Sequence, residues 1–164
     1  MKTKLKKYIK EILGFIIILF IASNAVSYFK STDLNKEPLQ EKTFTLLDDS
    51  KYIVQDKPLL IYVWATWCPV CKFQSPNIQS LSDDYQVLTI AVQSGNEYAI
   101  EEYLQKEEYN FKVINDESGR LASSFNVNVY PTTFIYDKKH TLKFTDIGYT
   151  STLSLYLKMF LANL

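Results

Sequence analysis

An apolar segment that leads directly into a pair of cysteines constrains this chain more than any other feature. Residues 59–64 (LLIYVW) are continuously apolar and rich in strand formers, which predicts a strand buried on both faces. The segment WCPVC follows, and residues 68–81 read as a helix, with Pro69 suited to its first turn. This order places Cys68 at the N-terminus of the helix and Cys71 one turn further in.

The two cysteines are expected to have different roles. Unpaired N–H groups and the helix dipole favour a thiolate at a helix N-terminus, so Cys68 is the expected nucleophile. Cys71 is near enough to close a disulfide with Cys68, and it should resolve the mixed disulfide that the first attack creates. A purely structural disulfide is disfavoured, because so small a loop removes little entropy from the unfolded chain. Val70 offers the thiolate no polar partner, so we expect a reducing or isomerising pair.

Metal binding is the main alternative for two closely spaced cysteines. A structural zinc site needs four ligands, and this spacing supplies two. The sole histidine, His140, lies in a polar, turn-like stretch, where we expect a solvated side chain. A copper-binding module is disfavoured as well, because this chain has no cluster of methionine or histidine near the two cysteines. We therefore expect no metal site, and no cofactor.

Strands and helices alternate along the remainder of the chain. Further strands are expected at residues 43–47, 51–54, 87–92, 111–114, 132–136 and 143–147. Further helices are expected within 97–108, at 119–125 and at the C-terminus. The apolar face of the last helix is marked by Leu153, Tyr156, Leu157, Phe160 and Leu161. This alternation predicts an α/β fold with helices around a central sheet.

The N-terminal part of the chain predicts export. Five lysines lie within the first ten residues, and residues 12–22 carry no charge. With the softer stretch to Phe29, the apolar run is about the length that crosses a bilayer, with the N-terminus in the cytoplasm. A cleavable signal peptide is the alternative, because Ser23 and Ala25 suit the small-residue cleavage positions. Both interpretations carry the remainder of the chain out of the cytoplasm.

Four segments follow from this division. They are a cytoplasmic basic N-terminus, a transmembrane anchor, a linker and one domain, at residues 1–11, 12–29, 30–42 and 43–164. From Ser31 onward there are 12 lysines and arginines against 17 aspartates and glutamates, a net charge of −5. An acidic domain lacks the basic footprint of nucleic-acid binding. Outside the cytoplasm disulfides persist, which favours redox chemistry for the cysteine pair.

The strand LLIYVW, the segment ATWCPVC, the internal Pro76 and the later VYPTTF together resemble the thioredoxin superfamily. The resemblance covers residues 43–164, and it looks closest to the TlpA-like and suppressor-of-copper-sensitivity D-like oxidoreductases, which are anchored and exported. It implies a thioredoxin-like fold, with a central mixed β-sheet flanked by helices after an N-terminal transmembrane helix. It also implies a single-pass protein of the inner, cytoplasmic membrane with its catalytic domain on the periplasmic or extracytoplasmic side.

The resemblance also assigns site residues. Cys68 matches the family nucleophile, Cys71 the resolving cysteine, and Pro131 the cis-proline that faces the disulfide. From the residues alone, Pro131 is equally compatible with a trans turn. The residues expected to contact substrate are Trp67, Pro69, Val70, Tyr130 and Pro131. Tyr130 is bulkier than the usual residue before this proline, and it either contacts substrate or only covers the site.

Two departures from the family pattern concern the second thiol. Thioredoxins carry a buried aspartate where this chain has Tyr62, and many TlpA-like reductases carry a glutamate where it has Gln74. Both usual proton acceptors are therefore missing, and we expect Cys71 to depend on water or on a substrate group.

The expected function is a protein-disulfide oxidoreductase that reduces or rearranges disulfides of exported proteins. Its expected partners are exported protein thiols and disulfides, together with a membrane electron-transfer protein that recharges it. A disulfide-forming oxidase of the same fold is the alternative direction. A peroxidase is disfavoured, because Ala65 stands where a threonine would be needed three residues before the nucleophile.

Overall fold

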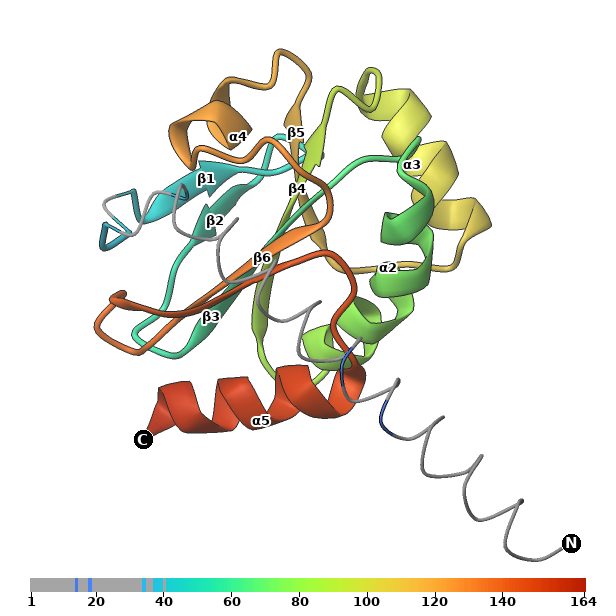
Figure 1. Ribbon diagram of the computed structural model, residues 1–164. Helices are drawn as coiled ribbons and strands as arrows, with labels where there is room; N and C mark the ends of the chain where they lie inside the picture. The colour runs from blue at the N-terminus through green and yellow to red at the C-terminus, as the bar shows by residue number, and fades with distance from the viewer. Residues whose placement is uncertain (1–13, 15–17, 19–33, 35–36, 40) are drawn as a thin grey trace, which may run out of the picture. The chain divides into compact units, whose positions relative to one another are not determined.

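The structure, a computed structural model, describes residues 14, 18, 34, 37–39 and 41–164 (Figure 1). The chain divides into two compact units, Met1–Asp33 and Leu34–Leu164. Apart from residues 14 and 18, the expected membrane anchor lies outside the described residues. Within the part that is described, no helix has the length and apolar character needed to cross a membrane. The four-segment division of the chain therefore stays a prediction.

A five-stranded mixed sheet forms the centre of the second unit, with the strand order β5-β4-β3-β6-β7. Its strands are β3 (Leu59–Trp64), β4 (Gln86–Val92), β5 (Lys112–Asp116), β6 (Thr132–Tyr136) and β7 (Leu142–Ile147). β3 and β4 are parallel, as are β4 and β5, whereas β6 is antiparallel to both β3 and β7. A separate antiparallel pair consists of β1 (Thr43–Thr45) and β2 (Lys51–Ile53). The mixed sheet confirms the predicted fold class.

The central position of β3 explains its unbroken apolar sequence. All six of its residues are buried. Because side chains alternate along a strand, Leu59, Ile61 and Val63 enter one hydrophobic cluster, and Leu60, Tyr62 and Trp64 enter the other. Both faces of the strand are therefore covered, and the expectation from its sequence is confirmed.

Helices cover both faces of the sheet (Figure 1). They are α2 (Pro69–Ser82), α3 (Glu97–Lys106), α4 (Arg120–Ser124) and α5 (Thr152–Asn163). Buried residues of α2, α3 and α5 pack with Tyr62 and Trp64 of β3. Ala122 of α4 and Phe44 of β1 belong to the cluster on the opposite face. Every expected strand and helix is present, with ends that differ by no more than two residues.

The segment before β1 contributes to the core. Leu34 and Leu39 lie in the stretch expected to be a polar linker, and both are buried in the cluster that contains Phe44. The backbone N–H of Leu39 donates to the His140 carbonyl at 3.0 Å. This part of the chain is therefore attached to the domain at two apolar positions.

His140 is not the solvated residue that we expected. Its side chain is buried, and Nε2 lies 3.2 Å from the Gln55 carbonyl oxygen. The turn itself is present between β6 and β7, but the segment around Leu39 packs over it. A polar sequence around a turn predicts the turn, and it does not reveal a later covering segment.

The buried face of α5 also differs from the prediction. Of the five residues expected on the buried face, Tyr156 is half-buried. The other four are exposed: Leu153, Leu157, Phe160 and Leu161. The buried residues are Leu155, Met159 and Ala162. Apolar residues lie on more than one side of this helix, so their spacing alone does not select the packed side.

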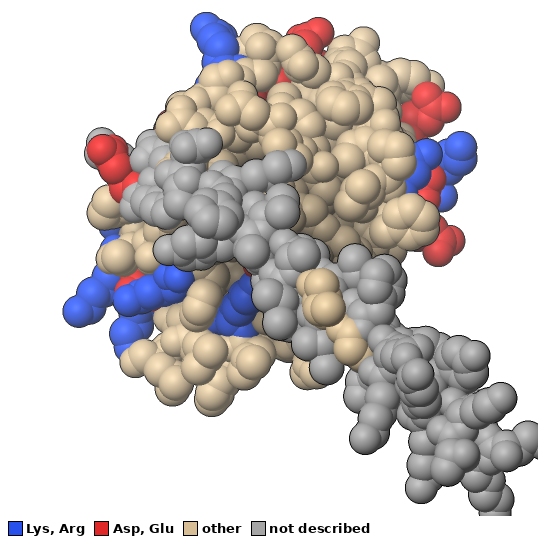
Figure 2. All heavy atoms as spheres, in the orientation of Figure 1, with Lys and Arg blue, Asp and Glu red and all other residues tan. Residues whose placement is uncertain are grey.

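On the face seen in Figure 2, uncharged side chains cover most of the centre of the domain, and charged side chains lie mostly toward its edges.

Candidate active site

Cys68 and Cys71 form a disulfide at the start of α2, with their Cα atoms 5.2 Å apart. Cys68 is the N-cap of the helix, with an extended backbone, and Pro69 occupies the first turn. The backbone N–H of Cys71 donates to Sγ of Cys68, with a nitrogen-to-sulfur distance of 3.2 Å. A helix N-terminus leaves such donors unpaired, and here one is directed at the sulfur that would carry negative charge.

Both sulfur-bearing residues are covered. Cys71 has an exposed fraction of 0%, and Cys68 is only 4% exposed. The nearby Trp67 and Val70 are 56% and 42% exposed. An attacking partner therefore meets these two side chains before it reaches the Cys68 sulfur.

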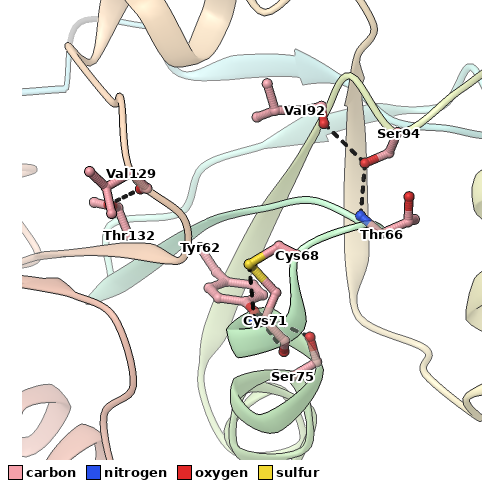
Figure 3. The surroundings of a disulfide bond; sticks show 9 residues. All are labelled: Tyr62, Thr66, Cys68, Cys71, Ser75, Val92, Ser94, Val129 and Thr132. Atoms are coloured by element: carbon pink, nitrogen blue, oxygen red, sulfur yellow. Dashed lines mark hydrogen bonds between the residues drawn. A yellow bond between two sulfur atoms is a disulfide. The ribbon is translucent and has the colours of Figure 1, made fainter.

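Trp67 is exposed but held in one orientation. Its Nε1 donates to the Gln93 carbonyl at 3.0 Å, and its ring meets the ring of Tyr130 edge to face, with centroids 5.7 Å apart. The preceding residue is fixed as well, because the Thr66 N–H donates to Ser94 Oγ at 3.0 Å (Figure 3). These bonds attach the loop between β3 and α2 to the end of β4.

The loop before β6 lies at the same end of the sheet as the disulfide. Val63 pairs with Thr132, so Pro131 falls opposite the end of β3 from which the chain enters WCPVC. The Tyr130–Pro131 peptide bond is cis, as the resemblance implied. Thr132 Oγ1 donates to the Val129 carbonyl at 2.7 Å within this turn (Figure 3).

Gly148 connects this turn to the segment that precedes α5. Its N–H donates to the Pro131 carbonyl at 2.8 Å, and its φ of +88° lies in the left-handed region that glycine adopts at little cost. Gly148 is thus in direct contact with the proline of the site.

Tyr62 extends from β3 to the first turns of α2. Its hydroxyl donates to the Cys71 carbonyl at 3.3 Å and lies 3.2 Å from Ser75 Oγ (Figure 3). Tyr62 and Ser75 are both fully buried, and burial raises the pKa of Tyr62 well above its ordinary value. From the sequence, Tyr62 is notable only because it occupies the position at which thioredoxins carry a buried aspartate. The contact between its hydroxyl and Cys71 comes from the structure.

Gln74 joins α2 to the segment before α5. The side chain is fully buried, and Oε1 accepts a hydrogen bond from the Thr150 N–H at 2.8 Å. Its Nε2 has no hydrogen-bond partner in the part of the chain that the structure describes. A buried amide donor therefore lies one helical turn after Cys71.

Two exposed aromatic residues near the site were not expected from the sequence. Phe73 is exposed on α2 and Tyr149 on the segment before α5. Phe73 shares a helix face with Asn77, whose Nδ2 donates to the Thr150 carbonyl at 3.0 Å. That face of α2 is therefore directed toward the segment that carries Tyr149. Isolated aromatic residues in a sequence do not reveal such a neighbourhood.

The structure brings together all the residues expected at the site, from Trp67 to Cys71 and at Tyr130 and Pro131. Over the described ranges there is no group of three or more histidine, cysteine, aspartate or glutamate residues suited to a metal ion.

Comparison with known proteins shows similarity over most of the chain, including the two cysteines. Residues 28–145 match the AhpC/TSA family. A thioredoxin-like protein of Haemophilus influenzae is 33% identical over 167 residues, covering 97% of each chain. The thiol-disulfide oxidoreductase ResA of Oceanobacillus iheyensis is 25% identical over 120 residues, which cover 71% of this chain and 59% of ResA.

A solved structure shares the fold. A secreted disulfide oxidoreductase of Mycobacterium tuberculosis, homologous to E. coli DsbE, superposes with a TM-score of 0.63 at 23% identity. The match covers 73% of this chain and 94% of that one. The thioredoxin-like arrangement of a mixed sheet flanked by helices is therefore that of a solved protein.

Proposed function

Because the chain belongs to the AhpC/TSA family and is a thiol–disulfide oxidoreductase of thioredoxin-like fold, we propose that it reduces or isomerises disulfides of exported proteins. Cys68 is the nucleophile and Cys71 the resolving thiol. The observation that carries this proposal is the N–H of Cys71 directed at the Cys68 sulfur from the start of α2. A thiolate formed there is stabilised by that donor and by the helix dipole.

The electrons of the reaction come from the two cysteines alone. The Cys68 thiolate attacks a substrate disulfide, one substrate sulfur leaves as a thiolate that takes up a proton, and a mixed disulfide remains. Cys71 then loses its proton and attacks Cys68, which releases the second substrate thiol and closes the pair. Two electrons pass from the enzyme dithiol to the substrate.

The reducing or isomerising direction is supported by Val70. Strong oxidants stabilise the reduced nucleophile heavily, and the valine between these cysteines provides no hydrogen bond or charge for that purpose. The opposite direction, a disulfide-forming oxidase, is the second candidate. A copper-binding role has less support, because the cysteine pair supplies only two ligands.

A peroxidase function is also disfavoured for this member of the family. Ala65, three residues before Cys68, is buried and has no hydroxyl to offer a peroxide. The next residue, Thr66, has a hydroxyl, but it stands two residues before Cys68 and not three.

We place the enzyme outside the cytoplasm, tethered to the cytoplasmic membrane by residues 12–29 and recharged there by a membrane electron-transfer protein. The lysine-flanked apolar run supports this location. Mass spectrometry of the protein purified from membranes should find residues 1–30 still attached. A mature chain that begins at Val26 would instead establish a cleaved signal peptide.

The activity itself is tested by mixing the reduced protein with an oxidised, disulfide-containing polypeptide and counting the substrate thiols that appear. Loss of Cys68 in the variant Cys68→Ser should abolish their release. Equal release by the wild type and this variant would refute the proposed function.

A further inference from the structure

The resolving half of the reaction creates a chemical problem at Cys71. Its thiol must lose a proton before it can attack, and a charged sulfur is disfavoured at a fully buried position. Carboxylates usually serve this step in related proteins, but the two corresponding positions hold Tyr62 and Gln74. A different group must lower the cost of the Cys71 thiolate.

Resting on the function proposed above, we propose that Tyr62 is the positioning residue of the resolving step, and that its hydroxyl provides the hydrogen bond that stabilises the Cys71 thiolate. The proton of Cys71 passes to water. The thiolate then attacks Sγ of Cys68, the bond between Cys68 and the substrate sulfur breaks, and the substrate leaves as a thiolate that is protonated by water. Tyr62 keeps its own proton throughout.

The location of the hydroxyl supports this role. It lies 3.3 Å from the Cys71 carbonyl oxygen and 3.2 Å from Ser75 Oγ, one helical turn further on. Figure 3 shows the Tyr62 ring beside Cys71, directed from β3 toward the helix. Both residues of the hydroxyl pair are fully buried.

The lengths of these contacts indicate that the hydroxyl is available. Hydrogen bonds between oxygens are strongest near about 2.7–2.8 Å, and contacts of 3.2–3.3 Å are weak. A hydrogen bond to an ionised acceptor is roughly twice as strong as one between neutral groups. When Cys71 ionises, a shift of the Tyr62 hydroxyl from the carbonyl toward the sulfur would therefore exchange a weak bond for a strong one.

Protonation of Tyr62 is secured by its surroundings. Burial among apolar side chains disfavours the phenolate, and it raises the pKa of Tyr62 far above neutral pH. Tyr62 is therefore a donor and not a base at neutral pH. This distinguishes it from a carboxylate at the same position, which would accept the proton.

An aromatic disulfide that releases a coloured thiolate separates the two half-reactions. The first equivalent of colour reports attack by Cys68 on the reagent, and the second reports resolution by Cys71. In Tyr62→Phe, which removes only the oxygen, we expect an unchanged first phase and a second phase about three- to tenfold slower at neutral pH. The pH midpoint of the second phase should rise by about one unit, the size expected for one hydrogen bond to a charged group.

Tyr136→Phe is the matched control. Tyr136 is another buried tyrosine, on β6 and in the cluster on the opposite face of the sheet, so both phases should be unchanged. Ser75→Ala provides a second variant should Tyr62→Phe fold poorly. It removes the neighbour that holds the Tyr62 oxygen, and it should move the second phase in the same direction, with recovery in Ser75→Thr.

The proposal is overturned if folded Tyr62→Phe keeps the wild-type second phase and midpoint, or if both phases slow equally. It is also overturned if Gln74→Met reproduces the shift while Tyr62→Phe does not, since the unpaired Gln74 amide would then be the donor. Absence of the first phase in the wild type would instead refute the proposed function.

Discussion

The rings of Trp67 and Tyr130 meet edge to face across the active site, with centroids 5.7 Å apart and planes at 86°. One ring follows β3 and the other precedes β6, so this contact joins the cysteine loop to the cis-proline loop. Trp67 is also bound through Nε1 to the Gln93 carbonyl, whereas the Tyr130 side chain makes no hydrogen bond to any residue that the structure describes. Tyr130 is the more adaptable partner of the two.

Replacing Tyr130 tests whether it contacts substrate. We expect Tyr130→Ala to raise KM for a disulfide-containing polypeptide about two- to tenfold with little change in kcat, because an aromatic pair contributes about 0.5–1.5 kcal/mol. The rate with a small disulfide reagent should stay unchanged, and Tyr130→Phe should behave as the wild type. A faster reaction with the small reagent at unchanged KM would show that Tyr130 only covers the disulfide.

The order of the two cysteines predicts which variant traps substrate. Cys71→Ser retains the nucleophile but lacks the resolving thiol, so mixed disulfides with substrate should accumulate. Cys68→Ser retains only the fully buried thiol and should form none. Non-reducing electrophoresis after a quench with acid measures both. Accumulation with Cys68→Ser and not with Cys71→Ser would reverse the assignment.

Buried tyrosines predict a loss of stability at alkaline pH. The pKa values of Tyr52, Tyr103 and Tyr136 are raised to about 12, mainly by burial, against about 10 in an unfolded chain. Below about pH 10 both states are protonated and this stability is fully present. Between about pH 10 and 12 the unfolded chain loses these protons while the folded protein keeps them, so the free energy of unfolding must fall.

Denaturant unfolding across this range, with tyrosinate absorbance recorded in parallel, measures the effect. The decline should be shallower in Tyr136→Phe than in the wild type, which separates the tyrosines from lysines that titrate in the same range. Identical slopes for the two proteins would contradict the assignment of this effect to Tyr136.

Several elements of the fold were predictable because local sequence and burial agree. The strand at Leu59–Trp64 is buried on both faces and uniformly apolar, and Pro69 and Cys68 mark the start of α2 without ambiguity. Such positions depend on neighbours in sequence and on a simple periodicity. The same agreement located the two cysteines at a helix N-terminus.

Other features depend on contacts between distant segments, which no local pattern contains. The burial of His140 requires the chain around Leu39 to cross the turn, a separation of about a hundred residues. The bond between Thr150 and Gln74 and the hydroxyl of Tyr62 at Cys71 arise in the same way. For α5, apolar residues on several sides left the packed face undetermined, and neighbouring elements select Leu155 and Met159.

The reduction potential of the Cys68–Cys71 pair determines the direction in which electrons flow between this protein and its substrates. Equilibrating the protein with mixtures of reduced and oxidised glutathione, and counting protein thiols after an acid quench, gives this potential. Because the helix N-terminus stabilises the Cys68 thiolate and Val70 adds no polar partner, we expect a value more negative than about −180 mV. A value of about −120 mV would contradict a reducing or isomerising role and would identify the protein as a disulfide-forming oxidase.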